Sequence, residues 1–329
     1  MVARSRLLSR ILVADIGGTN ARFAVANAET LELTQLGQML CFDHATIETA
    51  IGEFLAKLAD KPRCAALAVA APVWGDHVQL TNSHWSFRTS ELRLALCLDE
   101  LLVVNDFEAL ALALPTLTLS ELHQIGGIAP LEQATKVALG PGTGLGVGGL
   151  VWYSGRWITV AGEGGHMSLA AFGEHELAVV RQFREGRGHV SAEQPISGPG
   201  LRELYRFLLS AGGPDASNSD EVDVVGRALG GEDQIAEDAL RLFTVWLGRF
   251  AGDIALAFGA RGGVYIGGGI APKITAELSK GPFRDAFDQH GRMSGYLASI
   301  PVYVILSEFA TLRGVAVAAR EKLDVSQPT

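Results

Sequence analysis

The sequence predicts an α/β fold with two domains. Apolar runs of strand length alternate along the chain with Ala- and Leu-rich runs of helical length. The chain has 329 residues, 48% hydrophobic and 19% charged, which is long enough for two domains with their own cores. Strand-turn-strand patterns rich in glycine occur at residues 11–26 and 136–153, and we expect one in each domain.

The first of these patterns lies near the N-terminus. Ile11 to Ala14 and Ala21 to Ala26 are strand-like, and they flank the turn Asp15-Ile16-Gly17-Gly18-Thr19-Asn20. Glycine lets the backbone approach a ligand closely, and successive N–H groups in a tight turn bind anions. The turn therefore suits a magnesium-bound polyphosphate, with Asp15 holding the metal through a water molecule. An ordinary Asn/Gly hairpin turn is the alternative.

A carboxylate, Asp106, lies just after the strand predicted at residues 101–104. Leu101 to Val104 is an apolar run that delivers Asn105 and Asp106 at its carboxyl end, as at the ligand-bearing edge of an open α/β sheet. Asp106 could equally be a helix N-cap that accepts N–H bonds from Ala109 and its neighbours. The two roles compete, because a carboxylate held by N–H donors has a lowered pKa and is a poorer base. Pro115 predicts the end of the following helix.

The second glycine turn spans residues 139–146, between strand-like runs at 136–138 and 147–153. Residues 144–149 match the dinucleotide pattern G-x-G-x-x-G, but that pattern must open a helix, and a hairpin-like sequence follows here. Because no helix follows the pattern, the sequence excludes an NAD-dependent oxidoreductase. A P-loop is excluded as well, because the sequence contains no Gly-Lys pair.

A third glycine cluster follows the apolar run that ends at Ile266. Gly267, Gly268 and Gly269 lead into a predicted helix at 274–278, with Pro272 near its first turn. Backbone at such a junction can lie flat against a nucleotide base or sugar. The alternative is that these glycines only allow close packing of the helix on the sheet.

These elements, in this order, resemble the bacterial type of ATP-dependent glucokinase, within the sugar kinase, Hsp70 and actin superfamily. The matching stretches run over most of the chain: Asp15 to Phe23, Thr81 to Trp85, Asn105 to Phe107, Gly142 to Gly146, Gly162 to His166, Gly188 to Glu193, Ser197 to Leu201, and Gly263 to Pro272.

The resemblance implies a two-domain actin-like ATPase (ribonuclease H-like) fold with an interdomain cleft. It places a small α/β domain at residues 1–115 plus 306–329 and a large α/β domain at 116–305. The last helix, roughly Ala310 to Lys322, would return to the small domain, and residues 212–220 are the best loop candidate. Ligands would bind in the cleft, and closure would exclude water.

The resemblance also implies roles for individual residues. Asp106 would be the base that takes the proton of the sugar 6-hydroxyl. The sugar would be bound by Asn82, Asn105, Asp106, Glu163, His166 and Glu193. ATP would be bound by Ala14, Asp15, Ile16, Gly17, Gly18, Thr19, Asn20, Gly142, Thr143 and Gly144, with Gly267 and Gly268 beside the adenosine. Short carboxylates, amides and an imidazole suit hydroxyls that both donate and accept, and such a site discriminates against analogues that leave its polar groups unpaired.

The sequence departs from the family pattern at two positions. Ser168 stands where the related enzymes usually have Asp, and Pro141 where a small residue such as Ala is common. The repressor, open-reading-frame and kinase group of sugar kinases is a rival family, but the cysteine-rich zinc loop that usually follows its Gly-His segment is absent here. No second His or Cys stands at metal-ligand spacing near His166.

Composition limits the class of partner. A net charge of -9 and a pI near 5.4 argue against nucleic acid or an anionic membrane as a main partner. Cys41, Cys64 and Cys97 are odd in number and lack a C-x-x-C, so neither a disulfide framework nor a zinc site is expected. No apolar stretch approaches the length of a spanning helix, and the basic residues 1–10 lead into a strand, so the expected location is the cytoplasm.

The predicted function is ATP-dependent phosphorylation of glucose to glucose 6-phosphate, with ATP and Mg2+, and the resemblance implies a homodimer. Two alternatives stay open. One is a kinase for mannose, fructose or N-acetylmannosamine. The other is a non-catalytic sugar sensor on the same fold, although the ten residues before the first strand leave no room for the DNA-binding module that such sensors usually carry.

Overall fold

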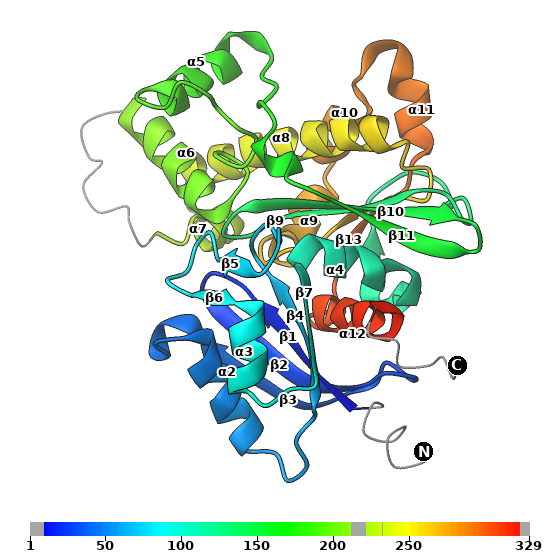
Figure 1. Ribbon diagram of the computed structural model, residues 1–329. Helices are drawn as coiled ribbons and strands as arrows, with labels where there is room; N and C mark the ends of the chain where they lie inside the picture. The colour runs from blue at the N-terminus through cyan, green and yellow to red at the C-terminus, as the bar shows by residue number, and fades with distance from the viewer. Residues whose placement is uncertain (1–9, 212–221, 232, 323–329) are drawn as a thin grey trace. The chain divides into compact units, whose positions relative to one another are not determined.

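A computed structural model describes residues 10–211, 222–231 and 233–322, which form two compact units (Figure 1). Unit 1 comprises the described residues up to Leu117 and from Ser307 onward, and unit 2 runs from Thr118 to Leu306. The loop expected at 212–220 and the basic residues 1–9 lie outside the described residues.

Unit 1 is built on a sheet whose strands, among the described residues, follow the order β3-β2-β1-β4-β7. β1 pairs antiparallel with β2 and parallel with β4, and β4 pairs parallel with β7. Ile16 is aligned with Val69, and Val69 with Asn105, so the carboxyl ends of the three parallel strands meet at one edge. The strands are β1 (Arg10–Ile16), β2 (Asn20–Asn27), β3 (Leu33–Leu40), β4 (Cys64–Val69) and β7 (Glu100–Asn105), with the separate pair β5 (His77–Gln79) and β6 (Ser86–Arg88).

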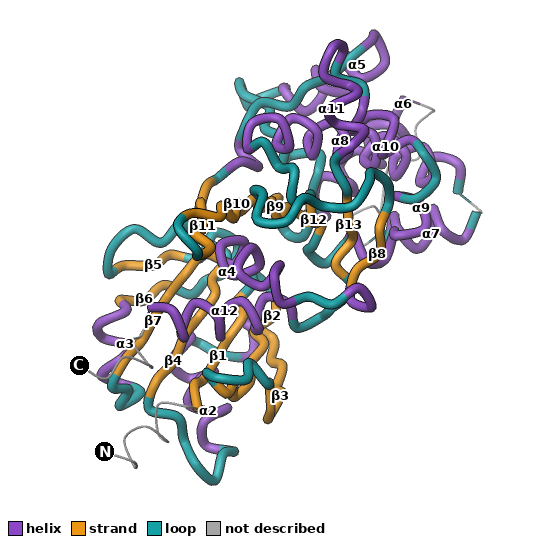
Figure 2. Tube along the Cα trace, turned by 90° about the vertical axis from the view of Figure 1, so that its right-hand side faces the viewer, coloured by secondary structure: helices purple, strands orange, loops and turns teal. Residues whose placement is uncertain are grey.

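Helices cover both faces of this sheet, which is why β4 is buried along its whole length. The ring of Phe54 on α2 (Ile47–Ala56) stacks on Phe23 of β2 at 5.2 Å. On the other face lie α4 (Asp106–Ala113) and α12 (Ala310–Lys322), as Figures 1 and 2 show. The bounds of α12 are those predicted, and α4 ends just before Pro115. Unit 1 also contains α3 (Thr89–Ala95) and the 3-10 helices η1 (Cys41–Asp43) and η2 (Leu114–Thr116).

Unit 2 is built on a second sheet with the described strand order β11-β10-β9-β12-β13-β8. β9 and β10 flank the second glycine turn, and β10 forms an antiparallel hairpin with β11. A hairpin therefore follows this turn, as predicted, and not the helix that a dinucleotide site requires. The strands are β8 (Leu122–Gln124), β9 (Lys136–Pro141), β10 (Leu145–Tyr153), β11 (Arg156–Gly162), β12 (Val264–Ile266) and β13 (Val302–Ile305).

The long helix α8 (Gln234–Phe258) is central to the core of unit 2. The Asp233 carboxylate caps its start, and Gly259, at φ 61°, ends it in the left-handed conformation. After β12, the 3-10 helix η5 (Ala271–Ile274) holds Pro272, and only then does α9 (Thr275–Leu278) begin, so the helix expected from Ile274 starts one residue later. The other helices are η3 (Leu119–Glu121), η4 (Gly164–His166), α5 (Gly173–Arg184), α6 (Gly198–Ala211), α7 (Val224–Gly230), α10 (Pro282–Asp288), η6 (Gly291–Met293) and α11 (Ser294–Ser299).

Candidate active site

The first glycine turn joins β1 to β2 in unit 1. Gly17 N–H donates to the carbonyl of Asn20 at 2.9 Å, whereas the N–H groups of Gly18 and Thr19 have no partner among the described residues. A Cβ on Gly18 would lie 2.7 Å from the carbonyl oxygen of Asn82, so only glycine fits beside that residue. The turn therefore has two N–H groups available for an anion.

Asp15 is the carboxylate at the start of this turn. Its side chain is 17% exposed, and its nearest cation is Arg22, with Nη1 3.5 Å from Oδ2. Burial raises the pKa of Asp15, and Arg22 only partly opposes this effect. A desolvated carboxylate with one distant cation fits a divalent metal that takes its remaining ligands from phosphate and water.

The carboxyl edge of β1, β4 and β7 brings the predicted residues of unit 1 together. Ala70 N–H donates to the carbonyl of Ile16 at 3.0 Å, and the Asn105 amide donates to the carbonyl of Ala71 at 3.3 Å. Thr81 N–H, next to Asn82, donates to the carbonyl of Ala70 at 3.4 Å. The glycine turn, Asn82 and Asn105-Asp106 thus share one edge of one sheet.

Asn105, and not Asp106, is the N-cap of α4. Its Oδ1 accepts the N–H groups of Phe107 at 2.9 Å and Glu108 at 3.2 Å. The cap interpretation of Asp106 is therefore wrong. Asp106 is the first residue of the helix, where its Oδ1 accepts the N–H of Phe107 at 2.9 Å.

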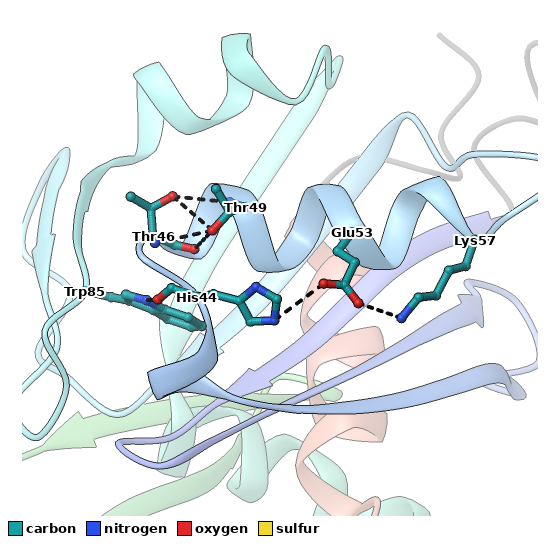
Figure 3. Close-up of polar contacts among 6 residues, drawn as sticks. All are labelled: His44, Thr46, Thr49, Glu53, Lys57 and Trp85. Carbon is teal, nitrogen blue, oxygen red and sulfur yellow. Dashed lines mark hydrogen bonds and ion pairs between the residues drawn. The ribbon is translucent and has the colours of Figure 1, made fainter.

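The segment that carries Asn82 is anchored to the residues before α2 (Figure 3). The carbonyl of His44 accepts Trp85 Nε1–H at 3.0 Å and lies 2.9 Å from Nε2 of His84, while the His44 ring is 3.7 Å from a Glu53 oxygen. Figure 3 also shows the Thr46–Thr49 capping box that starts α2. A hollow of about 430 Å³ lies beside this anchor, lined by Gly18, Thr19, Leu40, Cys41, Phe42, Asn82, Ser83 and His84.

The second glycine turn joins β9 to β10 in unit 2. Gly142 N–H donates to the carbonyl of Gly144 at 2.8 Å, and in the described part of the chain the N–H groups of Thr143 and Gly144 have no partner. The Glu193 carboxylate accepts the N–H of Leu145 at 2.8 Å, and a Cβ on Gly144 would clash with it. This turn also presents two free N–H groups.

Glu163 precedes η4 and His166 is its last residue, and η4 packs against the same turn. Gly165 is buried, and a Cβ there would clash with the carbonyl of Leu145. Glu193 N–H donates to the carbonyl of Gly165 at 2.9 Å. The structure therefore brings Glu193 and the Glu163–His166 segment beside the second glycine turn, although they are distant in sequence.

The third glycine cluster lies along the second turn. Gly267 N–H donates to the carbonyl of Leu139 at 2.8 Å, and Gly268, at φ 80°, approaches Pro141 so closely that a Cβ would clash with its carbonyl. A hollow of about 500 Å³ opens nearby, lined by Gly198, Leu201, Arg202, Ile270, Lys273 and residues 222–226 and 229 of the α7 region.

Comparison with known proteins decides the family. The family model described as Glucokinase matches residues 12–322. The chain is 45% identical over 306 residues to a glucokinase of Chromobacterium violaceum, which covers 93% of this chain and 88% of the relative. A crystal structure of a glucokinase from an Antarctic psychrotroph is 35% identical, with a TM-score of 0.82 over 95% of this chain and 99% of that one. The chain belongs to the glucokinase family.

Glucokinases transfer phosphate from ATP to glucose, so the chain is an ATP-dependent sugar kinase with the two-domain actin-like fold that the resemblance implied. A Streptomyces griseus glucokinase of the repressor, open-reading-frame and kinase family, solved with glucose and AMPPNP, shares that fold at 21% identity and a TM-score of 0.67, over 95% of this chain and 99% of that one. Among the described residues, no cluster of three or more His, Cys, Asp or Glu could hold a metal by itself. Nor is any described helix long and apolar enough to cross a membrane.

Several contacts around these candidate site residues have no local signal in the sequence. His44 lies 41 residues before its partner Trp85. At Ser168, the departure from the family pattern, the hydroxyl lies 3.1 Å from Nε2 of His189. A buried pair between Glu176 and Arg249 spans 73 residues. Only the structure reveals these pairs.

Proposed function

We propose that this glucokinase transfers the γ-phosphoryl group of ATP to the 6-hydroxyl of glucose, with Asp106 as the general base. The bond between O6 and the γ-phosphorus forms as the bond between that phosphorus and the bridging oxygen breaks. ADP leaves, and the hydroxyl proton goes to the Asp106 carboxylate.

The observation that carries this proposal is the alignment of Ile16, Val69 and Asn105 at one sheet edge. Neighbouring strands lie about 4.8 Å apart, so the Asp15 turn and Asp106 are separated by roughly two strand spacings. Asn105 and not Asp106 is the N-cap of α4, and the Asp106 carboxylate, which accepts the N–H of Phe107, stands at the first residue of the helix. These contacts support Asp106 as a base placed within reach of a phosphate-binding turn.

The phosphates would be bound by the free N–H groups of the two glycine turns, at Gly18 and Thr19 and at Thr143 and Gly144. Asp15 would hold Mg2+ through a water molecule. The metal would neutralise charge on the phosphate oxygens. The adenosine would lie beside Gly267 and Gly268, next to the hollow near α7.

The side chains proposed to bind sugar hydroxyls are Asn82, Asn105 and Asp106 in unit 1, and Glu163, His166 and Glu193 in unit 2. The Asn105 amide has one N–H beyond the bond to Ala71 that could donate to a hydroxyl. Glu163 and His166 are exposed, which leaves them accessible to a ligand.

Purified protein should release ADP from MgATP only when a hexose is present. We expect glucose to give the highest kcat/KM in a panel with mannose, fructose and N-acetylmannosamine. Faster turnover of another hexose would reassign the substrate. Glucose binding by calorimetry without ADP release would instead favour a sugar sensor.

We further propose a cytoplasmic homodimer. Light scattering of the purified chain tests the dimer, and a mass of about 35 kDa in solution would contradict it, because one chain weighs 34.8 kDa.

A further inference from the structure

The segment after His166 forms a short antiparallel ladder with the segment that carries Glu193. Ala192 N–H donates to the carbonyl of Met167 at 2.8 Å, and Leu169 N–H donates to the carbonyl of Val190 at 3.0 Å. Glu193 N–H continues the ladder to Gly165. A displacement of either segment would therefore move the other.

A buried ion pair lies at the far end of this ladder. Arg249, on α8, is 6% exposed, and its two terminal nitrogens donate to the two carboxylate oxygens of Glu176 at 2.7 and 3.1 Å. Trp246 Nε1–H donates to the same carboxylate at 2.9 Å. Burial alone would raise the pKa of Glu176, but the hydrogen bonds from Arg249, Phe172 N–H and Trp246 outweigh it and lower the pKa.

The same pair holds the backbone between the ladder and α5. Arg249 Nη1 donates to the carbonyl of Ala170 at 3.1 Å, and Phe172 N–H donates to Glu176 at 2.8 Å. The guanidinium also stacks on the Phe172 ring, 4.3 Å from its centroid. Two contacts from Arg249 thus fix residues 170–172 to the long core helix, and a third joins Phe172 to Glu176 on α5, a few residues after His166.

We propose that the Arg249–Glu176 pair is a positioning device for the sugar site, which keeps Glu163, His166 and Glu193 in register by fixing the end of the segment that joins them. This inference rests on the sugar-binding roles proposed above. A buried ion pair is a poor source of stability, since well-packed apolar residues often replace it without loss. Its bidentate geometry and its backbone contacts instead specify the path of residues 167–172.

Steady-state kinetics of Glu176→Gln and Arg249→Lys test the proposal, with Arg284→Gln as the matched control. Arg284 also pairs with an acid, Asp288, and also donates to two backbone carbonyls, of Leu297 and Ile300, but it lies on α10 and makes none of the ladder contacts. Both test variants should raise the KM for glucose, and the glucose Kd measured without nucleotide, by about 10-fold or more, because misplacement by 1 Å can cost about 10². The KM for MgATP should stay within about 2-fold of wild type. The control should lower Tm and leave both KM values unchanged.

Three outcomes would overturn the positioning role. The first is a Glu176→Gln variant with a lowered Tm and an unchanged glucose KM, and the second is an equal rise in both KM values. The third outcome is a wild type that phosphorylates no hexose, which would also overturn the proposed function. An active wild type with unchanged variants would overturn the positioning role alone.

Trp246→Phe, which removes a single hydrogen bond to Glu176, replaces Glu176→Gln if that variant does not fold. It should raise the KM for glucose and leave the KM for MgATP unchanged.

Discussion

The carboxylate of Glu193 accepts a hydrogen bond from the backbone N–H of Leu145 at 2.8 Å. Glu193 is a proposed sugar ligand, and Leu145 follows the glycine turn proposed to bind phosphate. One oxygen of the carboxylate therefore supports the turn while the other can accept from a hydroxyl. Glu163 has no such bond to the turn among the described contacts, so the two glutamates should respond differently to substitution.

Replacement of Glu163 by Gln should raise the KM for glucose and leave that for MgATP nearly unchanged. The expected loss in kcat/KM for glucose is about 1.5–3 kcal/mol, the range for a hydrogen bond to a charged group. Replacement of Glu193 by Ala should raise both KM values, because Leu145 loses its acceptor. Glu193→Gln keeps an acceptor for Leu145 and should affect glucose alone. An Ala variant with an unchanged KM for MgATP would argue against any support of the turn by Glu193.

Asp106→Asn should fold normally, bind glucose, and lose at least about 10² in kcat, the lower range for a positioned acid-base group. Thermal stability should be unchanged, since Asn105 supplies the helix cap. Rapid-quench or coupled ADP assays measure the chemistry, and calorimetry measures glucose binding. Turnover near the wild-type rate would remove Asp106 as the base.

Asn105→Ala should lower the free energy of unfolding by about 1 kcal/mol, because the N–H groups of Phe107 and Glu108 lose their acceptor. Asn105→Ser is the control, since, like Ala, it loses the amide bond to the Ala71 carbonyl, whereas its hydroxyl can still cap the helix. Urea denaturation of unligated protein measures the difference. Equal stability of the Ala and Ser variants would mean that the cap contributes nothing to α4.

Local sequence patterns predicted the strands and turns that are determined by residues close together in the sequence. The apolar runs marked the strands β1, β2 and β7, and the residues after Gly149 marked a hairpin and not a helix. Asn105 and Asp106 are both good caps and adjacent, so the pattern could not say which one takes the position. Glu176–Arg249 depends on how α5 packs on α8, and no spacing in the sequence encodes that contact.

Asp15→Asn should leave the protein as stable as wild type or more stable, while it impairs the use of MgATP. Burial raises the pKa of Asp15, so the folded protein keeps this proton to a higher pH than the unfolded chain does. At pH values above the folded pKa, the ionised carboxylate therefore costs stability, and the uncharged amide should be as stable or more stable.

The Tm difference between Asp15→Asn and wild type should consequently grow as pH rises from about 4, where the unfolded carboxyl titrates, toward 8. The same variant should lose most of its use of MgATP while its glucose Kd stays near that of wild type, because an amide cannot replace the charge that holds hydrated Mg2+. Thermal scans without nucleotide and ATP-dependent kinetics on one preparation give both readouts. If the variant were less stable than wild type at pH 8, Asp15 would be a stabilising partner of Arg22, and its proposed role as an under-compensated metal ligand would fail.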